Sequence, residues 1–399
     1  MGAAYNVTVS SPERGPLLVR ERGRGRAASR AIFFLYVLAL AGVSLRLYRT
    51  PVYSMDSIQY MGNALLMEET DIVRVHQRVY AEVERYVPKV PRDGLLGYEV
   101  GAPADQNKSR QERATNASRF AEFLPLFAIR PLYNQTLWLL SKTGMGLVRA
   151  GVVISVGSYF LLGILIYIWI RAYTHPGFAL GFSILLMMCP PMTILARDTT
   201  SDALATLIAF LAMYLIFEKR RLAAGMALLL ASIYFRTDFV VLAGPTILAC
   251  WLERRIELWK AGVLSLVAVA SVLCINHFAG DYGIRMLYYR AFVTTPTAPG
   301  EMAPHFSFRD YLSAFRAGIT MVTSSFFLPF LLLGTISAMA RRMRILFAVA
   351  VAYAGLHFVI LPSWEERYYA IFYVGMGVCA AVTAGAAVGN AQAGCDTAE

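Results

Sequence analysis

Long apolar runs are the feature that most constrains what this chain can fold into. Runs of predominantly apolar residues recur between positions 31 and 387, and a helix of about 20 such residues is what crosses the hydrocarbon core of a bilayer. Only 16% of the 399 residues are charged, 57% are hydrophobic, and the mean hydropathy is +0.52. A soluble domain would carry about a quarter charged residues, so the sequence predicts one helical membrane domain.

The predicted fold is all-α and polytopic, with about ten spans. The expected spans cover residues 31–47, 147–170, 178–196, 203–217, 222–235, 239–252, 261–278, 319–339, 345–361 and 368–387. The two that flank Arg236-Thr237-Asp238 are too short to cross a core of about 30 Å unaided. We expect them to form a hairpin whose polar turn lies at membrane depth, against protein or a wet cavity.

The polar segments define the remaining organisation. Residues 1–30 are expected to form a basic cytoplasmic tail, residues 31–388 the transmembrane domain, and residues 389–399 a cytoplasmic C-terminal tail. Residues 49–146 form the longest non-apolar region, which predicts a large extracytoplasmic loop of short interfacial helices. The first apolar run is followed by no small-residue cleavage pattern, so it is expected to be an uncleaved span.

Basic residues form short clusters between the apolar runs, which accounts for the net charge of +11. This distribution is typical of topology signals and not of a nucleic-acid-binding face. With a cytoplasmic N-terminus, the clusters at 171, 219–221, 254–260 and 341–344 all lie inside, as the positive-inside rule requires. The outer side then collects residues 56, 198–202, 236–238, 281–311 and 365–367. The chain is therefore expected to be an integral protein, of a bacterial inner membrane, whose active site is extracytoplasmic.

The cysteine and histidine residues do not have the sequence spacing of a metal-binding site. The five cysteines lie in apolar spans or in the tail, and the histidines lack paired metal-ligand spacing. No cofactor is required, and a divalent metal ion is allowed but not indicated. Walker A, GxSxG and dinucleotide-binding motifs are absent from the sequence. The sequence therefore does not have the motifs expected of an ATP-driven pump or of a serine hydrolase.

Asp56 is the strongest catalytic candidate, because it follows the first span by about nine residues, in Tyr53-Ser-Met-Asp-Ser-Ile-Gln-Tyr60. If Asp56 begins a helix, Tyr60 lies on the same face four residues later and is a candidate substrate-binding residue. A carboxylate there could take the proton of an attacking hydroxyl. The alternative is that Asp56 is only a helix N-cap.

Three arginines are candidates for binding an anionic group. Arg236 interrupts a mostly apolar stretch, where a charge is costly and is by default a functional hypothesis; the alternative is local pairing with Asp238. Arg367 precedes Tyr368 at the outer mouth of the last span, where a guanidinium could clamp a phosphate; the alternative is an interfacial anchor with a local ion pair. Arg290 belongs to a predicted loop, residues 281–311, that is rich in aromatic and cationic residues. This composition suits the binding of an anionic or sugar-bearing ligand; the alternative is a loop without a binding function.

The layout resembles the GT-C superfamily of membrane glycosyltransferases, of the protein O-mannosyltransferase and aminoarabinose-transferase type. The resemblance is carried by a basic N-terminus, by a first span followed by Asp56 in a large outer loop, and by three short motifs. These motifs are Arg197-Asp198-Thr-Thr-Ser-Asp202, Tyr-Phe-Arg236-Thr-Asp238 and Glu366-Arg367-Tyr368. The sequence departs from the family where members often have an acidic pair, because Ser57 follows Asp56.

The resemblance implies a sugar donor on a polyprenyl phosphate and a lipid, glycan or protein acceptor. Asp56 would act as the general base, and Arg236 and Arg367 would hold the donor phosphate, with Arg290 as a further candidate. The other candidates for substrate binding are Asp198, Asp202, Asp238, Glu366 and Tyr368, with Tyr60. The alternative function is a transporter or lipid flippase for an anionic or glycosylated substrate, and a non-catalytic scaffold is a third hypothesis.

Overall fold

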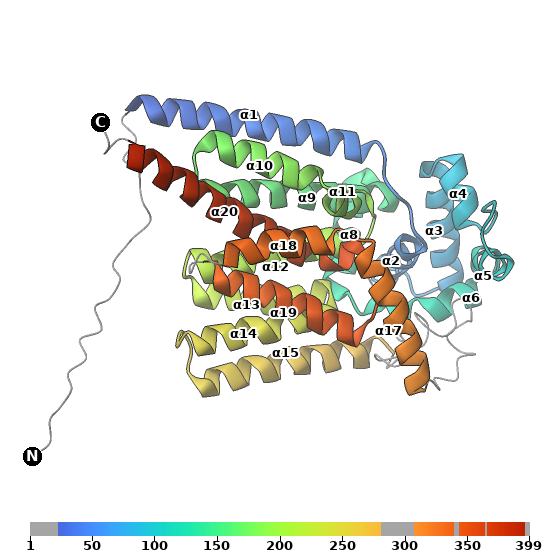
Figure 1. Cartoon of the computed structure of the whole chain (residues 1–399). Coiled ribbons are helices and arrows are strands. Elements are labelled where there is room, and N and C mark those ends of the chain that lie inside the picture. The colour runs from blue at the N-terminus through green and yellow to red at the C-terminus, as the bar shows by residue number, and fades with distance from the viewer. Residues whose placement is uncertain (1–22, 281–306, 339–342, 364, 396–399) are drawn as a thin grey trace, which may run out of the picture.

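The computed structural model describes residues 23–280, 307–338, 343–363 and 365–395. Within these ranges the chain is helical and forms no strand, which confirms the all-α prediction. Long helices lie side by side in a bundle, and short helices gather at one end of it (Figure 1). We call this the outer end of the bundle, and the end where α1 begins the basic end.

The bundle is built from the helices outside residues 49–146. Its elements are α1 (Gly23–Tyr48), α9 (Leu147–Arg171), α10 (Pro176–Met188), α11 (Pro190–Arg197), α12 (Asp202–Met213) with the π-helical turn η2 (Tyr214–Glu218), α13 (Leu222–Phe235), η3 (Thr237–Phe239), α14 (Val240–Leu252), α15 (Leu258–Phe278), α17 (Phe308–Thr323), α18 (Phe327–Ala338), α19 (Arg344–Ile360), η5 (Glu366–Tyr369) and α20 (Ala370–Cys395).

Four of these helices are long and apolar enough to cross a membrane: Arg26–Tyr48, Leu147–Arg171, Leu258–Phe278 and Glu366–Gly385. The number rises to six if each of two bent helix pairs counts as one span. Three shorter apolar helices, 222–235, 237–252 and 344–360, lie among them. The described chain is therefore compatible with an integral membrane protein, and the figure of ten spans stays a prediction.

Two expected spans are bent in the structure. The expected span 178–196 is broken between α10 and α11 by 64°, because Pro190 lacks an amide hydrogen and holds Cys189 in an extended conformation. The expected span 319–339 is divided into the end of α17 and α18, which meet at 69°. At this second break the Glu366 carboxylate accepts a hydrogen bond from the Phe326 amide, 3.1 Å away, near the start of α18.

Residues 49–146 form an outer unit of short helices with a core of its own. Its helices are α2 (Met55–Leu65), α3 (Ile72–Tyr86), α4 (Lys89–Leu95), α5 (Ala104–Thr115), α6 (Ala117–Phe123), α7 (Pro125–Ala128) and α8 (Pro131–Leu140), followed by η1 (Ser141–Met145). Val79, Phe120 and Tyr133 are among its fully buried side chains, and the core continues onto the start of α9.

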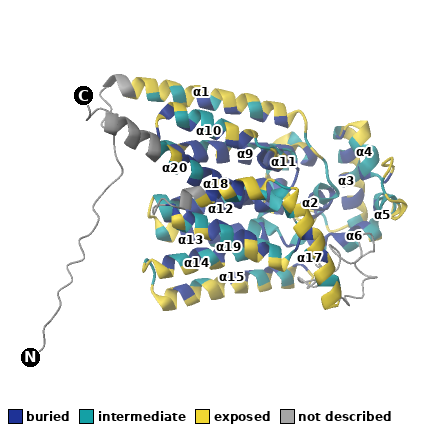
Figure 2. Cartoon of the chain, viewed as in Figure 1, coloured by how far each residue is buried: buried dark blue, intermediate teal, exposed yellow. Residues whose placement is uncertain are grey.

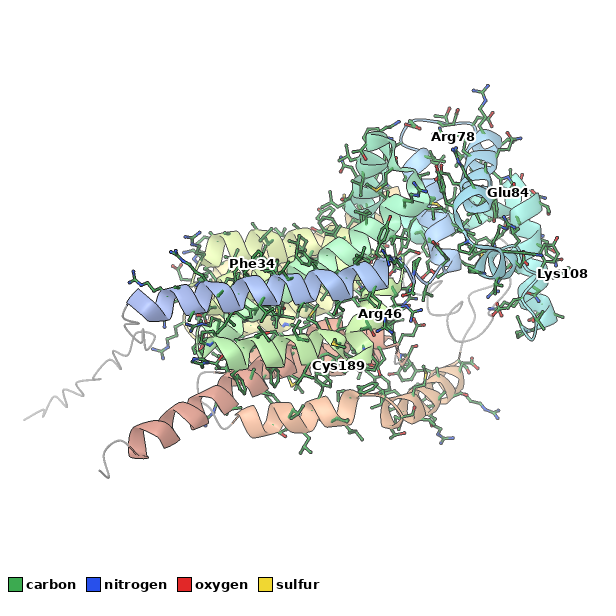
Figure 3. All side chains as sticks on the ribbon, turned by 90° about the horizontal axis from the view of Figure 1, so that it is seen from above. Phe34, Arg46, Arg78, Glu84, Lys108 and Cys189 are labelled. Carbon is green, nitrogen blue, oxygen red and sulfur yellow. The ribbon has the colours of Figure 1, made fainter. Side chains whose placement is uncertain are left out.

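The surfaces of the two regions differ in chemistry. Figure 2 shows exposed residues along much of α1 and α15, and these include large apolar side chains such as Phe34 and Leu266. Arg78, Glu84 and Lys108 instead lie on the outer unit, beyond the end of the bundle (Figure 3). Large exposed apolar side chains on the bundle and charged side chains on the outer unit are what a bilayer and its aqueous boundary favour.

Candidate functional site

Charged side chains from five separate segments meet where the outer unit joins the bundle. The carboxylate–arginine cluster, as we call it, consists of Asp56, Asp198, Asp202, Arg236, Asp238, His357 and Arg367. Asp56 comes from α2, the next two aspartates from the α11–α12 turn, and Arg236 and Asp238 from the α13–α14 turn. His357 lies in the last turn of α19, and Arg367 lies in η5.

Backbone contacts fix Asp56 and Asp198 at the same end of the bundle. The linker between α1 and α2 pairs with the α11–α12 turn, because the Val52 amide donates to the Arg197 carbonyl at 2.8 Å. The Arg197 Nε donates to the Thr50 carbonyl at 2.7 Å. Ser155 on α9 donates its hydroxyl to the Asp198 carbonyl at 2.8 Å, which ties this turn to the centre of the bundle.

The inner part of the cluster is a buried ion network around Arg236. Its Nη1 lies 2.5 Å from the Asp202 carboxylate and its Nε lies 2.7 Å from that of Asp238. His357 Nε2 lies 2.8 Å from Asp238 Oδ2. The side chains of Arg236 and Asp202 are each only 4% exposed. Because two carboxylates already compensate this buried guanidinium, the charge of Arg236 is satisfied within the protein.

Arg367 connects the inner network to the more exposed part of the cluster. Its guanidinium lies 2.7 Å from Asp198, 3.3 Å from Asp56 and 3.6 Å from Asp202. It also pairs with Glu365 at 2.9 Å. The Tyr368 ring is within cation–π distance of both arginines, with its centroid 4.5 Å from Arg236 Cζ and 5.0 Å from Arg367 Cζ.

Asp56 is the most exposed of the four aspartates in the cluster, with 31% of its side chain accessible. The alternative that it serves as the N-cap of α2 is wrong, because Ser54 occupies the N-cap position and Asp56 lies inside the first turn. Its carboxylate faces Arg367, which comes from 311 residues further along the chain. Asp56 therefore combines a fixed position with access to a ligand.

Asp198 has the electrostatic setting of a group that can exchange a proton near neutral pH. Burial raises the pKa of Asp198 to about 7, against the opposing effect of the Arg367 guanidinium. Its Oδ2 accepts a hydrogen bond from Arg367, whereas its Oδ1 is buried without a hydrogen-bond partner among the described residues. A protonated Asp198 would donate from that oxygen.

A second set of polar groups lies beside Asp56, around Tyr60. Arg130, the residue before α8, donates from Nη1 to the Tyr60 hydroxyl and lies over its ring, with 5.3 Å from Cζ to the centroid. Tyr60 and Tyr133 line a narrow, mostly apolar cavity of about 10 Å³, with Ser57 and Thr199 beside them. That is room for about one water molecule. The Tyr133 hydroxyl and the Arg130 Nε are buried without a hydrogen-bond partner in the part of the chain that the structure describes, and such groups are usually satisfied by water or a ligand.

One predicted site residue that the structure describes is not part of this arrangement. Glu366 points away from the cluster: its carboxylate accepts hydrogen bonds from the Tyr373 hydroxyl and the Phe326 amide. Arg290 lies outside the described residues. Asp238 and Asp202 belong to the buried network, where they contact Arg236.

Sequence reasoning missed Arg130 and His357. His357 lies inside the apolar run 345–361, so it carries the same signal that singled out Arg236, an ionisable residue in an apolar stretch. Arg130 stands in an aromatic-rich segment just before Pro131, and no local pattern links it to Tyr60, 70 residues earlier.

No three His, Cys, Asp or Glu residues in the described part of the chain are arranged to hold a metal ion. The aspartates of the cluster face arginine guanidinium groups instead. Comparison of the chain with protein-family models, with curated proteins and with solved structures gave no match.

Proposed function

We propose that this chain is a polytopic membrane glycosyltransferase, which moves a sugar from a polyprenyl-phosphate donor to an acceptor hydroxyl at the outer end of the bundle. The observation that carries the proposal is the pairing of a partly exposed carboxylate, Asp56, with Arg367 at 3.3 Å, within a cluster assembled from five segments. A carboxylate and a cation in one place are what this transfer requires.

The reaction assigns a role to each of these groups. The acceptor oxygen attacks the anomeric carbon, and the bond from that carbon to the phosphate oxygen breaks with its electron pair going to the phosphate. Asp56 takes the acceptor proton. The phosphate that leaves carries additional negative charge, which a guanidinium stabilises. Arg367 is the first candidate for this, because its side chain is 14% exposed and that of Arg236 only 4%.

The carboxylates around Arg367 determine how an anion can reach it. Asp56, Asp198 and Asp202 all face this guanidinium, so a phosphate entering the cluster meets negative charge. Because burial raises the pKa of Asp198 to about 7, this group can take a proton at neutral pH and reduce that charge. Arg130, beside Tyr60, adds a second guanidinium for the donor or the acceptor. Arg236 then acts by fixing Asp202 and Asp238.

The proposed topology has ten crossings. They are α1, α9, the bent pair α10–α11, α12 with η2, α13, α14, α15, α18, α19 and α20. The basic residues 219–221 and 254–255 lie at the end opposite the cluster, which supports a cytoplasmic basic end and an extracytoplasmic outer end. A bacterial inner membrane is the proposed location, and the GT-C fold is proposed with it.

A panel of radiolabelled polyprenyl-phosphate sugars, incubated with the purified protein and candidate acceptors, tests this proposal. The wild type should release polyprenyl phosphate and label an acceptor. Asp56→Asn keeps the shape but removes the base, so transfer should fall by about 10²-fold or more. Asp105→Asn, in the exposed first turn of α5, is the matched control and should transfer normally.

Equal turnover by wild type and Asp56→Asn would remove Asp56 from the mechanism. If the wild type consumes no donor in the panel while proteoliposomes accumulate or flip a labelled lipid-linked sugar, the transporter hypothesis replaces this one. The geometry supports transport less, because Arg236 is enclosed by carboxylates at one end of the helices and does not line a path along them.

A further inference from the structure

A second cavity lies at the basic end of the bundle, at the opposite ends of the helices that carry Arg236 and Asp202. Its volume is about 520 Å³, and it is lined by Ile216, Arg220, Leu222, Glu253 and Arg255. These residues come from η2, from the turn into α13, and from the turn between α14 and α15. None of them belongs to the proposed transfer site.

Both turns at this cavity place an arginine in the left-handed backbone region. Arg220 has φ 54° and Arg254 has φ 56°, and they are the only residues other than glycine with positive φ among those described. Each turn closes its helix with a backbone bond, from Arg221 to the Leu215 carbonyl at 2.8 Å and from Arg255 to the Cys250 carbonyl at 2.9 Å. Glycine is the usual residue in such a position because it adopts this conformation without strain. Arginine here adds charge at some cost in backbone energy.

The cavity combines a cationic rim with one partly exposed aliphatic side chain, that of Leu222, whereas the side chain of Ile216 is fully buried. Arg255 is held in place by the Ile216 carbonyl at 2.9 Å and by Glu253 at 2.5 Å. Arg220 is exposed at the rim. The amides at the start of α13 lie beside it, and no side chain caps them. A helix N-terminus next to a guanidinium favours an anion.

Neighbouring side chains place this rim at a membrane boundary. Leu252, Leu258 and Trp259 are each more than 60% exposed on the adjoining ends of α14 and α15. An exposed tryptophan at the end of an apolar helix is typical of the headgroup level of a bilayer, and exposed leucines beside it suit the adjoining hydrocarbon.

We propose that this cavity binds the headgroup phosphate of an anionic phospholipid. Arg220 and the first amides of α13 contact the phosphate, Arg255 and Glu253 form the fixed wall, and the partly exposed Leu222 faces the glycerol and the start of the acyl chains. Leu222 in the cavity and the exposed Leu252 and Leu258 beside it distinguish a lipid from inorganic phosphate, which gains nothing from apolar contacts. The proposal is independent of sugar transfer.

Lipid binding to the purified full-length protein tests the proposal. Phosphatidylglycerol, phosphatidylcholine and inorganic phosphate are titrated separately, and retained lipid is counted by native mass spectrometry. We expect the wild type to retain phosphatidylglycerol in preference to phosphatidylcholine. Arg220→Gln should weaken this binding by about tenfold, the loss of one charge-assisted contact. Arg254→Gln is the matched control, because Arg254 has the same backbone conformation and exposure but does not line the cavity; it should bind normally.

A second variant keeps the test valid if Arg220→Gln folds poorly. Arg220→Gly removes the charge and relieves the left-handed strain, so it should fold at least as well as the wild type and still lose the lipid. Equal losses in the Arg220 and Arg254 variants would mean diffuse surface charge and would overturn the site. Equal retention of the two lipids would overturn it as well. Competition by inorganic phosphate as effective as that by phosphatidylglycerol would overturn the lipid assignment.

Discussion

The two ends of α12, α13 and α14 carry charge in opposite ways. At the outer end, Asp202, Arg236 and Asp238 form ion pairs in which the Asp202 and Arg236 side chains are 4% exposed. At the basic end, Arg220 and Arg254 are exposed and sit in left-handed turns. The same three helices thus have a buried network of positive and negative charges at one end and an exposed group of mostly positive charges at the other.

The difference shows what each kind of charge can contribute. Buried charges are costly unless paired, so the outer end depends on every partner being present. Exposed charges are solvated and contribute little to stability, so their positions are free to serve topology or ligand binding. Substitutions at the two ends should therefore have very different effects.

The largest expected effect is from removing the central guanidinium of the buried network. Arg236→Ala leaves Asp202 and Asp238 buried without their main cation and should reduce the free energy of unfolding by about 3–5 kcal/mol. Arg254→Ala, at the other end, should change it by no more than about 0.5 kcal/mol. Thermal unfolding in one detergent measures both. A similar melting temperature for the two variants would contradict the contrast between the ends.

Close helix packing gives the next effect, and it does so at the basic end without involving charge. A Cβ on Gly225 of α13 would lie 2.5 Å from Ile216 Cγ1 and 3.0 Å from the Ala212 carbonyl. Gly225→Ala should therefore destabilise the protein by about 1–3 kcal/mol.

Gly181 of α10 provides the control for this substitution, because a Cβ there would meet nothing within 4 Å. Gly181→Ala should be neutral or stabilising by up to about 1 kcal/mol. Equal effects of the two substitutions would show that α12 and α13 are not packed as closely as described.

The pH dependence of stability should report on the outer end. Since the pKa of Asp198 is raised from 3.8 to about 7, its folded state binds a proton that the unfolded state has released. The contribution of this proton to the free energy of unfolding is fully present below about pH 4 and is lost as the pH rises through about 7. As the pH rises from about 4 to about 7, the melting temperature of Asp198→Asn should therefore rise relative to that of the wild type. A difference independent of pH would mean that Asp198 is ionised throughout that range.

The smallest effect should come from relieving strain at the basic end. Arg254→Gly accepts the φ of 56° without a Cβ clash and should stabilise the turn by up to about 1 kcal/mol. A differential scanning measurement against Arg254→Ala separates the loss of strain from the loss of charge. Destabilisation by glycine relative to alanine would contradict the left-handed assignment.

The sequence alone predicted the helical character of the chain and the positions of several breaks. Apolar content is a sum over neighbouring residues, so apolar helices can be predicted from short stretches of sequence. The polar residues at Arg236 predicted a break, and α13 ends there. The bend at Pro190 was missed because the two apolar segments on either side read as one run. Arg236 was identified because an ionisable residue inside an apolar stretch is rare. Asp56 and Arg367 were identified because they lie on the predicted outer side, after the first span and before the last one.

Only the tertiary structure decided which of these charges meet. Asp56 and Arg367 are 311 residues apart, and no local spacing determines whether their side chains point at each other. The same holds for Arg130 and His357, which joined the site, and for Glu366, which turned to Tyr373 and Phe326 instead. Apolar burial is non-directional and roughly additive, whereas an ion pair depends on the distance and orientation of two groups. Distance and orientation are fixed only when the helices pack.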